Sequence, residues 1–290
     1  MKELSLIILT YNSEKDIYDC LYSVYQHNDI GNRLEIIIVD NNSDGYVQMH
    51  DNITSLYPNV IIIPNTKNGG YGQGNNIGIQ AATAPIIAIM NPDIRLVMPV
   101  FQEMLNVFDN KQTVMCGGKQ YNNATTPAIS FWCDYHRSAF LQSFGISYYR
   151  KRDVYKQRSM WLSGAFFFIR KQEFEQIGLF DENIFMYGEE YDIHIRLQKM
   201  FPNKIIKYLP DLKYIHLIED RQLTVAALQK TLKSLLYLCS KHNISIRRFL
   251  FIQRTTNFLR FCMTNIVRIL GRPYNYSNYK LNRQVLRTLK

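Results

Sequence analysis

The stretch LSLIILTYN, from Leu4 to Asn12, decides the fold of this chain. Its apolar part, Leu4–Leu9, is short and almost uninterrupted, as expected of a strand that is buried on both faces of a sheet. Polar residues follow at once, and Asn12-Ser13-Glu14 predicts the start of a helix, because Asn and Ser are common helix caps. The stretch therefore predicts a strand–helix unit of an α/β protein.

The same unit recurs along the first part of the chain. Further apolar runs, with helix-like segments between most of them, are found at Glu35–Val39, Val60–Ile63, Ile86–Met90 and Val114–Cys116. This alternation predicts a mostly parallel central sheet flanked by helices. Ligands bind beyond the carboxyl ends of the strands in such sheets. We expect a binding site there, because three polar clusters follow predicted strands, namely Thr10–Asn12, Asp40–Asn42 and Asn91–Asp93.

The composition is that of an ordinary globular protein. Hydrophobic residues make up 47% and charged residues 20% of the 290 residues, which excludes a disordered chain. The five cysteines are scattered without metal-ligand spacing, which indicates reduced thiols in a cytoplasmic protein. The amino terminus runs directly into the first strand, and no run of about 18 uncharged apolar residues occurs. We therefore expect neither a secretion signal nor a membrane-spanning helix.

The positive charge is concentrated at one end of the chain. The net charge is +10, yet residues 221–290 hold fourteen Lys and Arg and no Asp or Glu, which leaves 20 basic and 24 acidic residues in the first 220. An apolar stripe at helical spacing lies roughly opposite Arg247, Arg254 and Arg268; its members are Phe249, Ile252, Leu259, Met263, Ile266 and Leu270. Such a helix is typical of an anionic membrane surface. Packing onto the catalytic domain, or formation of a homodimer, is the alternative.

Seven motifs occur along the chain in a fixed order. They are LTYN (Leu9–Asn12), VDNNSDG (Val39–Gly45), NGGYGQGNNIGI (Asn68–Ile79), MNPD (Met90–Asp93), WLSGA (Trp161–Ala165), GLFDE (Gly178–Glu182) and FMYGEEYDIHIRL (Phe185–Leu197). Together they resemble the inverting glycosyltransferases of family 2, whose catalytic domain has the GT-A fold. The resemblance implies a catalytic domain at 1–220, with a nucleotide-sugar half at about 1–117 and an acceptor half at about 118–220. A basic amphipathic helical tail would follow at 221–290.

The resemblance implies that the amino-terminal half binds the nucleotide of the donor. Tyr11 offers an aromatic face to the base, and Asp40 can accept a hydrogen bond from N3–H of uracil or thymine. The alternative for Asp40 is a turn cap, which is the role we expect for Asn41, Asn42 and Ser43. The glycines of Asn68–Gly78 do not have the spacing of a dinucleotide or Walker phosphate loop and predict a close approach of backbone to the nucleotide. The predicted nucleotide-binding residues are Thr10, Tyr11, Asn12, Asp40, Asn68, Gly70, Gly74, Asn76, Asn91 and Asp93.

Asn91-Pro92-Asp93 stands where the family carries an Asp-x-Asp metal motif. A hard divalent cation prefers carboxylate oxygens, of which Asp93 supplies one, whereas Asn91 supplies a neutral amide. We therefore expect Mg²⁺ or Mn²⁺ to be held by Asp93 and largely by the phosphates of the substrate. His216 matches the late histidine that joins the metal or the diphosphate in this family; a structural histidine beside a strand is the alternative.

Glu189-Glu190 matches the catalytic acidic pair of the family. The resemblance implies that Glu190 is the general base that takes the proton of the acceptor hydroxyl, and that Glu189 orients it or contacts the acceptor. The dipole of the predicted helix would keep both carboxylates ionised. Acidic residues in a first helical turn are also common caps, which is the alternative. The acceptor site is expected to be floored by Trp161, Gly164 and Ala165.

These inferences predict an inverting glycosyltransferase that moves a sugar from dTDP-rhamnose or a UDP-hexose to a lipid-linked saccharide acceptor. The Asn-Pro-Asp variant resembles that of rhamnosyltransferases in cell-surface polysaccharide (O-antigen or capsule) synthesis. The enzyme would be cytoplasmic and peripheral at the inner face of the cell membrane. A nucleic-acid-binding protein is an alternative, but the acidic residues of the first 220 would repel a phosphate backbone. A nucleotidyltransferase, the other alternative, would need paired metal-binding carboxylates and a basic activation loop near the amino terminus.

Overall fold

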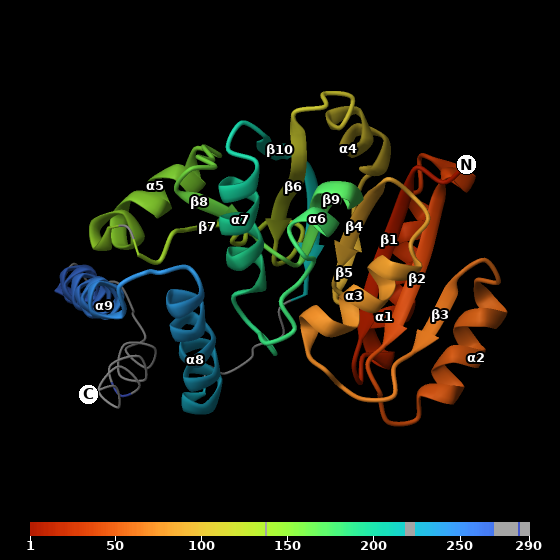
Figure 1. Cartoon of the computed structure of the whole chain (residues 1–290), viewed down its shortest axis with the longest axis horizontal. Helices are drawn as coiled ribbons and strands as arrows, with labels where there is room; N and C mark the ends of the chain where they lie inside the picture. The colour runs from red at the N-terminus through yellow and green to blue at the C-terminus, as the bar shows by residue number, and fades with distance from the viewer. Residues whose placement is uncertain (137, 218–223, 270–283, 285–290) are drawn as a thin grey trace. The chain divides into compact units, whose positions relative to one another are not determined.

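The computed structural model describes residues 1–136, 138–217, 224–269 and 284. The chain divides into two compact units, each built from several parts of the sequence (Figure 1). The first unit contains Met1–Ser130, Leu162–Phe185 and Glu189–Glu219. The second unit contains Phe131–Trp161, Met186–Gly188 and Asp220–Lys290. The tail predicted at 221–290 therefore shares its unit with a middle segment that sequence analysis assigned to the acceptor half.

An eight-stranded mixed sheet forms the centre of the first unit. The strand order is β3-β2-β1-β4-β9-β6-β10-β5. β1 pairs in parallel with β2 and β4, and β2 pairs in parallel with β3, whereas β9 runs antiparallel to both β4 and β6. The strands are β1 (Leu4–Thr10), β2 (Leu34–Asp40), β3 (Ile61–Pro64), β4 (Ile86–Met90), β5 (Ile94–Leu96), β6 (Thr113–Tyr121), β9 (Phe166–Arg170) and β10 (Ile205–His216). The apolar runs predicted as strands are all strands of this sheet.

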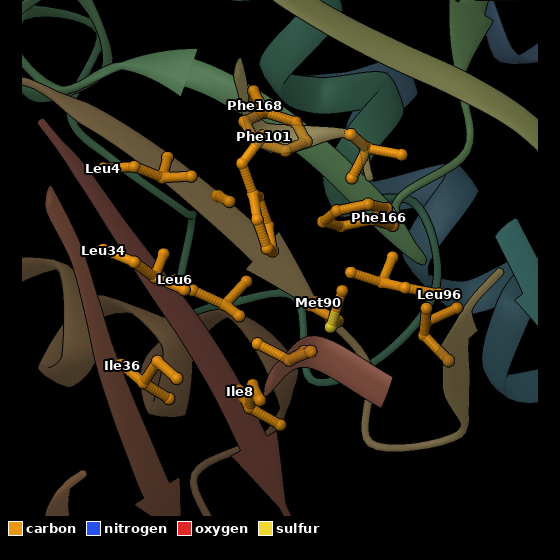
Figure 2. Packing of buried hydrophobic residues seen from close by; sticks show 14 of the residues in the cluster. Leu4, Leu6, Ile8, Leu34, Ile36, Met90, Leu96, Phe101, Phe166 and Phe168 are labelled. Atoms are coloured by element: carbon orange, nitrogen blue, oxygen red, sulfur yellow. The ribbon is translucent and has the colours of Figure 1, made fainter. Parts of the chain in front are cut away.

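Helices cover both faces of the parallel half of the sheet. Leu4, Leu6 and Ile8 of β1 belong to one large apolar cluster with residues of α1, α2 and α4 (Figure 2). Ile7 faces the opposite side, where a Cβ atom on Gly78 of α3 would lie 2.6 Å from Ile7 Cγ2. Leu4–Leu9 is thus buried on both faces because helices pack against each one. The helices of this unit are α1 (Glu14–Gln26), η1 (Gly31–Arg33), α2 (Tyr46–Leu56), α3 (Tyr71–Ala81), α4 (Phe101–Val107), α6 (Lys171–Gln176) and α7 (Glu189–Met200).

The late helix begins where the sequence predicted, at Glu189. The helical spacing of Ile193, Leu197 and Met200 predicts that all three lie on its buried side. Ile193 and Leu197 are buried at 0% and 1% exposure. The prediction was wrong for Met200, the last residue of α7, which is 52% exposed.

The second unit is mainly helical. It contains β7 (Phe131–Cys133), the π-helix η2 (Leu141–Gly145), α5 (Ile146–Lys151), β8 (Met160–Leu162, whose last residue belongs to the first unit), α8 (Val225–Lys241) and α9 (Ile246–Ile269). α9 packs against α8 and η2. None of the helices in the described ranges is both long enough and apolar enough to cross a bilayer.

The structure divides the predicted stripe of α9. Phe249 and Ile252, expected to face lipid, are buried inside the second unit at 1% and 7% exposure, whereas Ile266 of the same stripe is 58% exposed. Leu259 and Met263 are partly buried. Thr256, which interrupts the apolar pattern, is buried on the same side, and its carbonyl accepts a hydrogen bond from Ser143. The opposite, basic side instead exposes Phe251 (70%) and Phe258 (58%). Leu270 of the predicted stripe and the side chain of Arg268 lie outside the described residues.

All five cysteines are free thiols. Four of them are buried, and Cys262 on α9 is only partly buried. Burial raises the pKa of Cys20 to about 12 and that of Cys239 to about 11, and it also raises the pKa of Cys116.

Candidate active site

The three polar clusters that the sequence predicted at strand ends lie at one edge of the sheet in the first unit. Thr10 ends β1 and pairs in register with Asp40, which ends β2. Ile8 of β1 pairs with Met90, the last residue of β4, so the Asn91–Asp93 turn leaves the sheet at the same edge. Parallel pairing therefore gathers the clusters, as the sequence predicted from successive strand ends.

Asp40 is completely buried and hydrogen-bonded within the protein. Its carboxylate accepts hydrogen bonds from the hydroxyl of Thr10 (3.1 Å), from the backbone N–H of Ser43 (2.9 Å) and from the Ser43 hydroxyl (2.6 Å). Three of the roughly four acceptor positions of a carboxylate are thus occupied. In this conformation Asp40 fixes the turn after β2, the alternative that the sequence left open, and a contact with a base stays a prediction.

Tyr11 and Asn12 follow Thr10 out of the sheet. Tyr11 is 52% exposed, so its ring is accessible to a base. Asn12 adopts a positive φ of 51° and bonds to the turn after β2: its N–H donates to Ser43 Oγ, and its side-chain oxygen accepts from Asp44 N–H. The ends of β1 and β2 therefore hold each other and present Tyr11 to solvent.

A network of side-chain amides fixes the loop before α3. The Asn41 amide donates to Asn68 Oδ1 (2.9 Å) and to the Gly70 carbonyl (3.2 Å), and Asn41 Oδ1 accepts from Asn65 (2.8 Å). Gly70 has a φ of 93°, and a Cβ atom there would lie 2.5 Å from the Phe185 carbonyl oxygen. The sequence pattern predicted only a turn role for Asn41. The position of Asn41 directly after Asp40 was the one signal of this network in the sequence.

Gly74 and Asn76 secure the packing of α3. A Cβ atom on Gly74 would lie 2.3 Å from Leu9 Cδ1, so the helix approaches β1 closely here. The Asn76 side chain donates to the Phe180 carbonyl and to Glu182, and it accepts from the Phe180 N–H, each at 3.0 Å. A nucleotide contact by Asn76 would have to replace these bonds.

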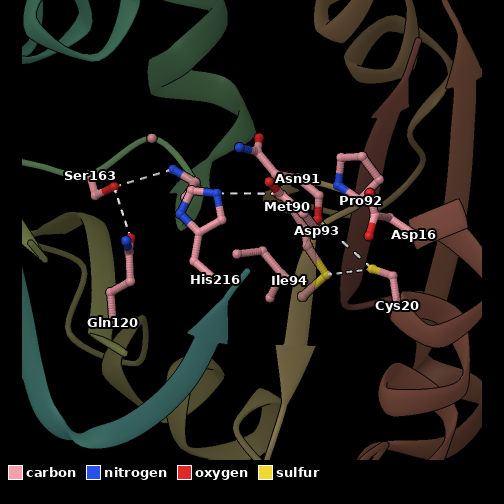
Figure 3. Close-up of polar contacts among 12 residues, drawn as sticks. Asp16, Cys20, Met90, Asn91, Pro92, Asp93, Ile94, Gln120, Ser163 and His216 are labelled. Atoms are coloured by element: carbon pink, nitrogen blue, oxygen red, sulfur yellow. Dashed lines mark hydrogen bonds and ion pairs between the residues drawn. The ribbon is translucent and has the colours of Figure 1, made fainter. Parts of the chain in front are cut away.

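Asp93 and His216 form a close pair of possible metal ligands (Figure 3). Asp93 Oδ1 lies 3.2 Å from His216 Nε2, and both side chains are largely buried. Adjacent ligands of an octahedral ion with bonds of about 2.1 Å are about 3 Å apart, so this spacing fits two corners of a Mg²⁺ or Mn²⁺ site. No group of three or more His, Cys, Asp or Glu side chains suited to a metal occurs within the described residues. The pair therefore fits a site that is completed by oxygens of a substrate.

Glu189 and Glu190 open α7, where the helix dipole favours negative charge. Glu189 is buried (2% exposed), whereas Glu190 is partly exposed. Burial raises the pKa of Glu190, and hydrogen bonds from the backbone N–H groups of Glu190 and Gly164 lower it; the net direction is upward. A raised carboxyl pKa is suited to proton transfer near neutral pH.

Gly164 and Ala165 connect the metal-ligand turn with Glu190. The Ala165 carbonyl accepts a hydrogen bond of 2.9 Å from the Asn91 N–H. Gly164 lies against Glu190, since a Cβ atom there would be only 2.1 Å from Glu190 Oε1. Trp161, the third predicted acceptor residue, belongs to the second unit, where its ring stacks on Trp132 at 6.0 Å between centroids.

A sequence model of the family named glycosyl transferase family 2 matches residues 5–178, which is more than half of the chain. The chain belongs to this family. The match includes the strand-end clusters and the Gly164 loop, and it ends before Glu189. Within glycosyl transferase family 2, the assignment of Glu190 and His216 therefore rests on the motifs and the geometry described above.

Several relatives are similar in sequence to this family 2 chain, among them two from Haloferax volcanii and Mycobacterium tuberculosis. The low-salt glycan biosynthesis hexosyltransferase Agl10 of Haloferax volcanii is 25% identical over 207 residues, which cover 69% of this chain and 62% of the relative. The N-acetylglucosaminyl-diphospho-decaprenol L-rhamnosyltransferase of Mycobacterium tuberculosis is 25% identical over 208 residues, which cover 63% of this chain and 66% of the relative. The chain thus spans just under two thirds of the length of each relative.

The mannosyltransferase PcManGT of Pyrobaculum calidifontis, solved in complex with GDP-Man and Mn²⁺, has a similar fold. Its TM-score is 0.61 at 14% sequence identity, and the match covers 100% of this chain and 81% of that one. The predicted GT-A fold of a family 2 glycosyltransferase, with a helical carboxyl-terminal region, is confirmed.

Proposed function

We propose that this chain transfers a sugar, with inversion of configuration, from a nucleoside-diphosphate sugar to an acceptor hydroxyl. The position of the Ser163–Ala165 loop is the observation that supports this most directly. The loop bonds to the Asn91–Asp93 turn through Ala165 and lies against Glu190 through Gly164. The turn that carries Asp93 and the candidate base Glu190 therefore both contact the same short segment, and transfer from a diphosphate donor requires a cation site and a base close together.

Each group has a chemical task in this proposal. Asp93 and His216 would hold Mg²⁺ or Mn²⁺, which neutralises the negative charge of the diphosphate when it is bound. Glu190 would take the proton of the acceptor hydroxyl while the acceptor oxygen bonds to C1 of the sugar and the bond from C1 to the diphosphate breaks. Glu189 would orient Glu190 or the acceptor, and Tyr11 would stack on the base.

The proposed donor is dTDP-rhamnose, with UDP-hexoses as the second choice, and the proposed acceptor is a lipid-linked saccharide of cell-surface polysaccharide synthesis. The name of the Mycobacterium relative, a rhamnosyltransferase for a decaprenol-linked saccharide, supports both choices. Asn91 in place of an acidic residue agrees with a site in which substrate phosphates complete the coordination of the cation.

The decisive experiment replaces Glu190 by Gln. A general base contributes about 10²–10⁴-fold, so Glu190→Gln should lose that much transfer activity while binding UDP or dTDP with Mn²⁺ as tightly as the native protein. Glu175→Gln is the matched control, because Glu175 is an exposed acid on α6 of the same unit. An equal loss of nucleotide binding in Glu190→Gln would show that the base is misplaced.

Thermal shift measurements separate this function from the alternatives. Stabilisation by UDP or dTDP with Mn²⁺ is expected, because ligands that bind the folded state raise the melting temperature. Stabilisation by oligonucleotides alone would favour a nucleic-acid-binding protein instead.

We also propose that the enzyme works in the cytoplasm at the inner face of the cell membrane, and that α9 binds anionic lipid. Arg247, Phe251, Arg254 and Phe258 recur at helical spacing on one exposed side of α9. Each arginine near an anionic surface contributes about 1 kcal/mol, and exposed aromatic rings can enter the headgroup layer. This basic aromatic face replaces the stripe that the sequence suggested.

Vesicle sedimentation tests this surface. The protein should sediment with vesicles of phosphatidylglycerol and phosphatidylcholine and not with phosphatidylcholine alone, and a Phe251→Ser/Phe258→Ser variant should lose this binding. Tyr22→Ser is the control, because Tyr22 is similarly exposed (61%) but lies on α1 of the other unit. Unchanged sedimentation of the double variant would exclude this face.

A further inference from the structure

Tyr71 connects two distant parts of the first unit. It opens α3, and its backbone N–H donates to the Phe185 carbonyl (2.9 Å). Its hydroxyl donates to the carbonyl of Gly164 (3.0 Å), 93 residues further along the chain. Its ring packs edge-on against Phe180, with centroids 5.7 Å apart and an interplanar angle of 88°. Tyr71 is therefore held at its backbone, its ring and its hydroxyl.

The other side of Gly164 supports the carboxylate of Glu190. A Cβ atom on Gly164 would lie 2.1 Å from Glu190 Oε1 and 2.2 Å from Glu190 Cγ, so the carboxylate fills the space that any other side chain would need. The backbone N–H of Gly164 also lowers the pKa of this carboxylate, as a hydrogen-bond donor beside it does. The carbonyl of Gly164 thus accepts the hydrogen bond from the Tyr71 hydroxyl, and the N–H of the same residue lies beside Glu190.

The charges around the Tyr71 hydroxyl keep it protonated. Burial, followed by the charges of Glu190 and Glu189 on α7 and of Asp93 after β4, raises the pKa of Tyr71 well above its usual range. The phenol therefore remains a hydrogen-bond donor throughout the pH range in which carboxylates titrate. The three charged groups that raise the pKa of Tyr71 are carboxylates, and the two interactions that lower the pKa of Glu190 both come from backbone N–H groups.

We propose that Tyr71 is a positioning residue, which fixes Gly164 so that the glycine N–H and its bare Cα form the seat of the Glu190 carboxylate. This inference rests on the proposed role of Glu190 as the base. Tyr71 acts through Gly164 and has no assigned contact with substrate. Loss of the hydroxyl would release the Gly164 carbonyl, weaken the N–H bond to the carboxylate and make Glu190 harder to ionise.

A carbon-13 NMR titration of the glutamate carboxyl groups tests the inference without any substrate. The Glu190 resonance is assigned as the one that disappears in Glu190→Gln. Tyr71→Phe should raise the apparent pKa of Glu190 by about one unit, which corresponds to the loss of one hydrogen bond of about 1.4 kcal/mol. Tyr155→Phe is the control, because it removes a comparable bond from a tyrosine hydroxyl to a backbone carbonyl, that of Met160, in the second unit.

The outcomes separate the inference from the proposed function. An unchanged Glu190 titration in a folded Tyr71→Phe protein would overturn the positioning role, whatever the activity of Glu190→Gln. Full transfer activity of Glu190→Gln would overturn the proposed base and leave the titration result intact. If Tyr71→Phe does not fold, Gly164→Ala decides, since its methyl group must displace the carboxylate and shift the Glu190 resonance and its titration. A native titration in Gly164→Ala would also overturn the inference.

Discussion

Replacing Asn41 by Ala should destabilise the first unit far more than its place in a turn suggests. Asn41 is 2% exposed and makes three hydrogen bonds, to Asn65, Asn68 and Gly70. At about 0.5–1.5 kcal/mol each, their loss lowers the free energy of unfolding by about 3 kcal/mol. For a protein of this size that corresponds to a melting temperature lower by roughly 6–12 °C.

Thermal unfolding followed by circular dichroism measures this effect, and calorimetric titration with UDP or dTDP measures whether the loop before α3 still accepts a nucleotide. Asn106→Ala is the control, because Asn106 is an exposed amide on α4 whose replacement should change the stability by less than about 0.5 kcal/mol. A double variant with Asn68→Ala should lose less than the sum of the two single losses, since the side chains share a bond. If Asn41→Ala has the same melting temperature as Asn106→Ala, the amide network does not hold this loop.

Three further predictions concern the core, acid stability and metal binding. Gly78→Ala should cost about 1–3 kcal/mol in urea unfolding, because its methyl group would lie 2.6 Å from Ile7 Cγ2; a native midpoint would show that α3 can shift freely. Burial raises the pKa of Glu35, but hydrogen bonds from Ser5 and Thr83 outweigh it, so the pKa is lowered overall. Ionised Glu35 therefore stabilises the fold at a pH above its unfolded pKa of about 4.3, and this stabilisation is lost as the pH falls through the lower pKa of the folded state. In Glu35→Gln the melting temperature should depend less on pH over this acidic range. EDTA should abolish transfer, because it removes the cation. His216→Ala should weaken the Mn²⁺-dependent binding of nucleotide, measured by calorimetry, and should leave the melting temperature within a few degrees of the native value. Equal Mn²⁺ dependence in the variant and the native protein would exclude His216 as a ligand.

The sheet and the edge that carries the site were predictable from the sequence. Continuous apolar runs such as Leu4–Leu9 and Ile86–Met90 are typical of parallel strands that are covered on both faces, and parallel pairing then brings Thr10, Asp40 and Asn91 together. These relations follow from the parallel direction of the strands, which the alternation of strands and helices along the chain predicted.

Contacts that depend on side-chain geometry were not predictable. The hydrogen bond from Tyr71 to Gly164 and the amide network of Asn41 join segments that are far apart in the chain, and no local sequence pattern indicates that these segments meet. In α9, apolar residues occur on both sides of the helix, as Phe249 and Phe251 show, so periodicity did not decide which side packs. The grouping of Phe131–Trp161 with the carboxyl-terminal helices was hidden for the same reason.

The unequal accessibility of the thiols provides a built-in reporter of folding. With Cys20, Cys116, Cys133 and Cys239 enclosed and Cys262 partly open to solvent, a thiol reagent should modify the folded chain at one position first and at the others only as it unfolds. Counting the modified cysteines by mass spectrometry would reveal, for every variant described above, whether a lost activity reflects altered chemistry or a loosened interior.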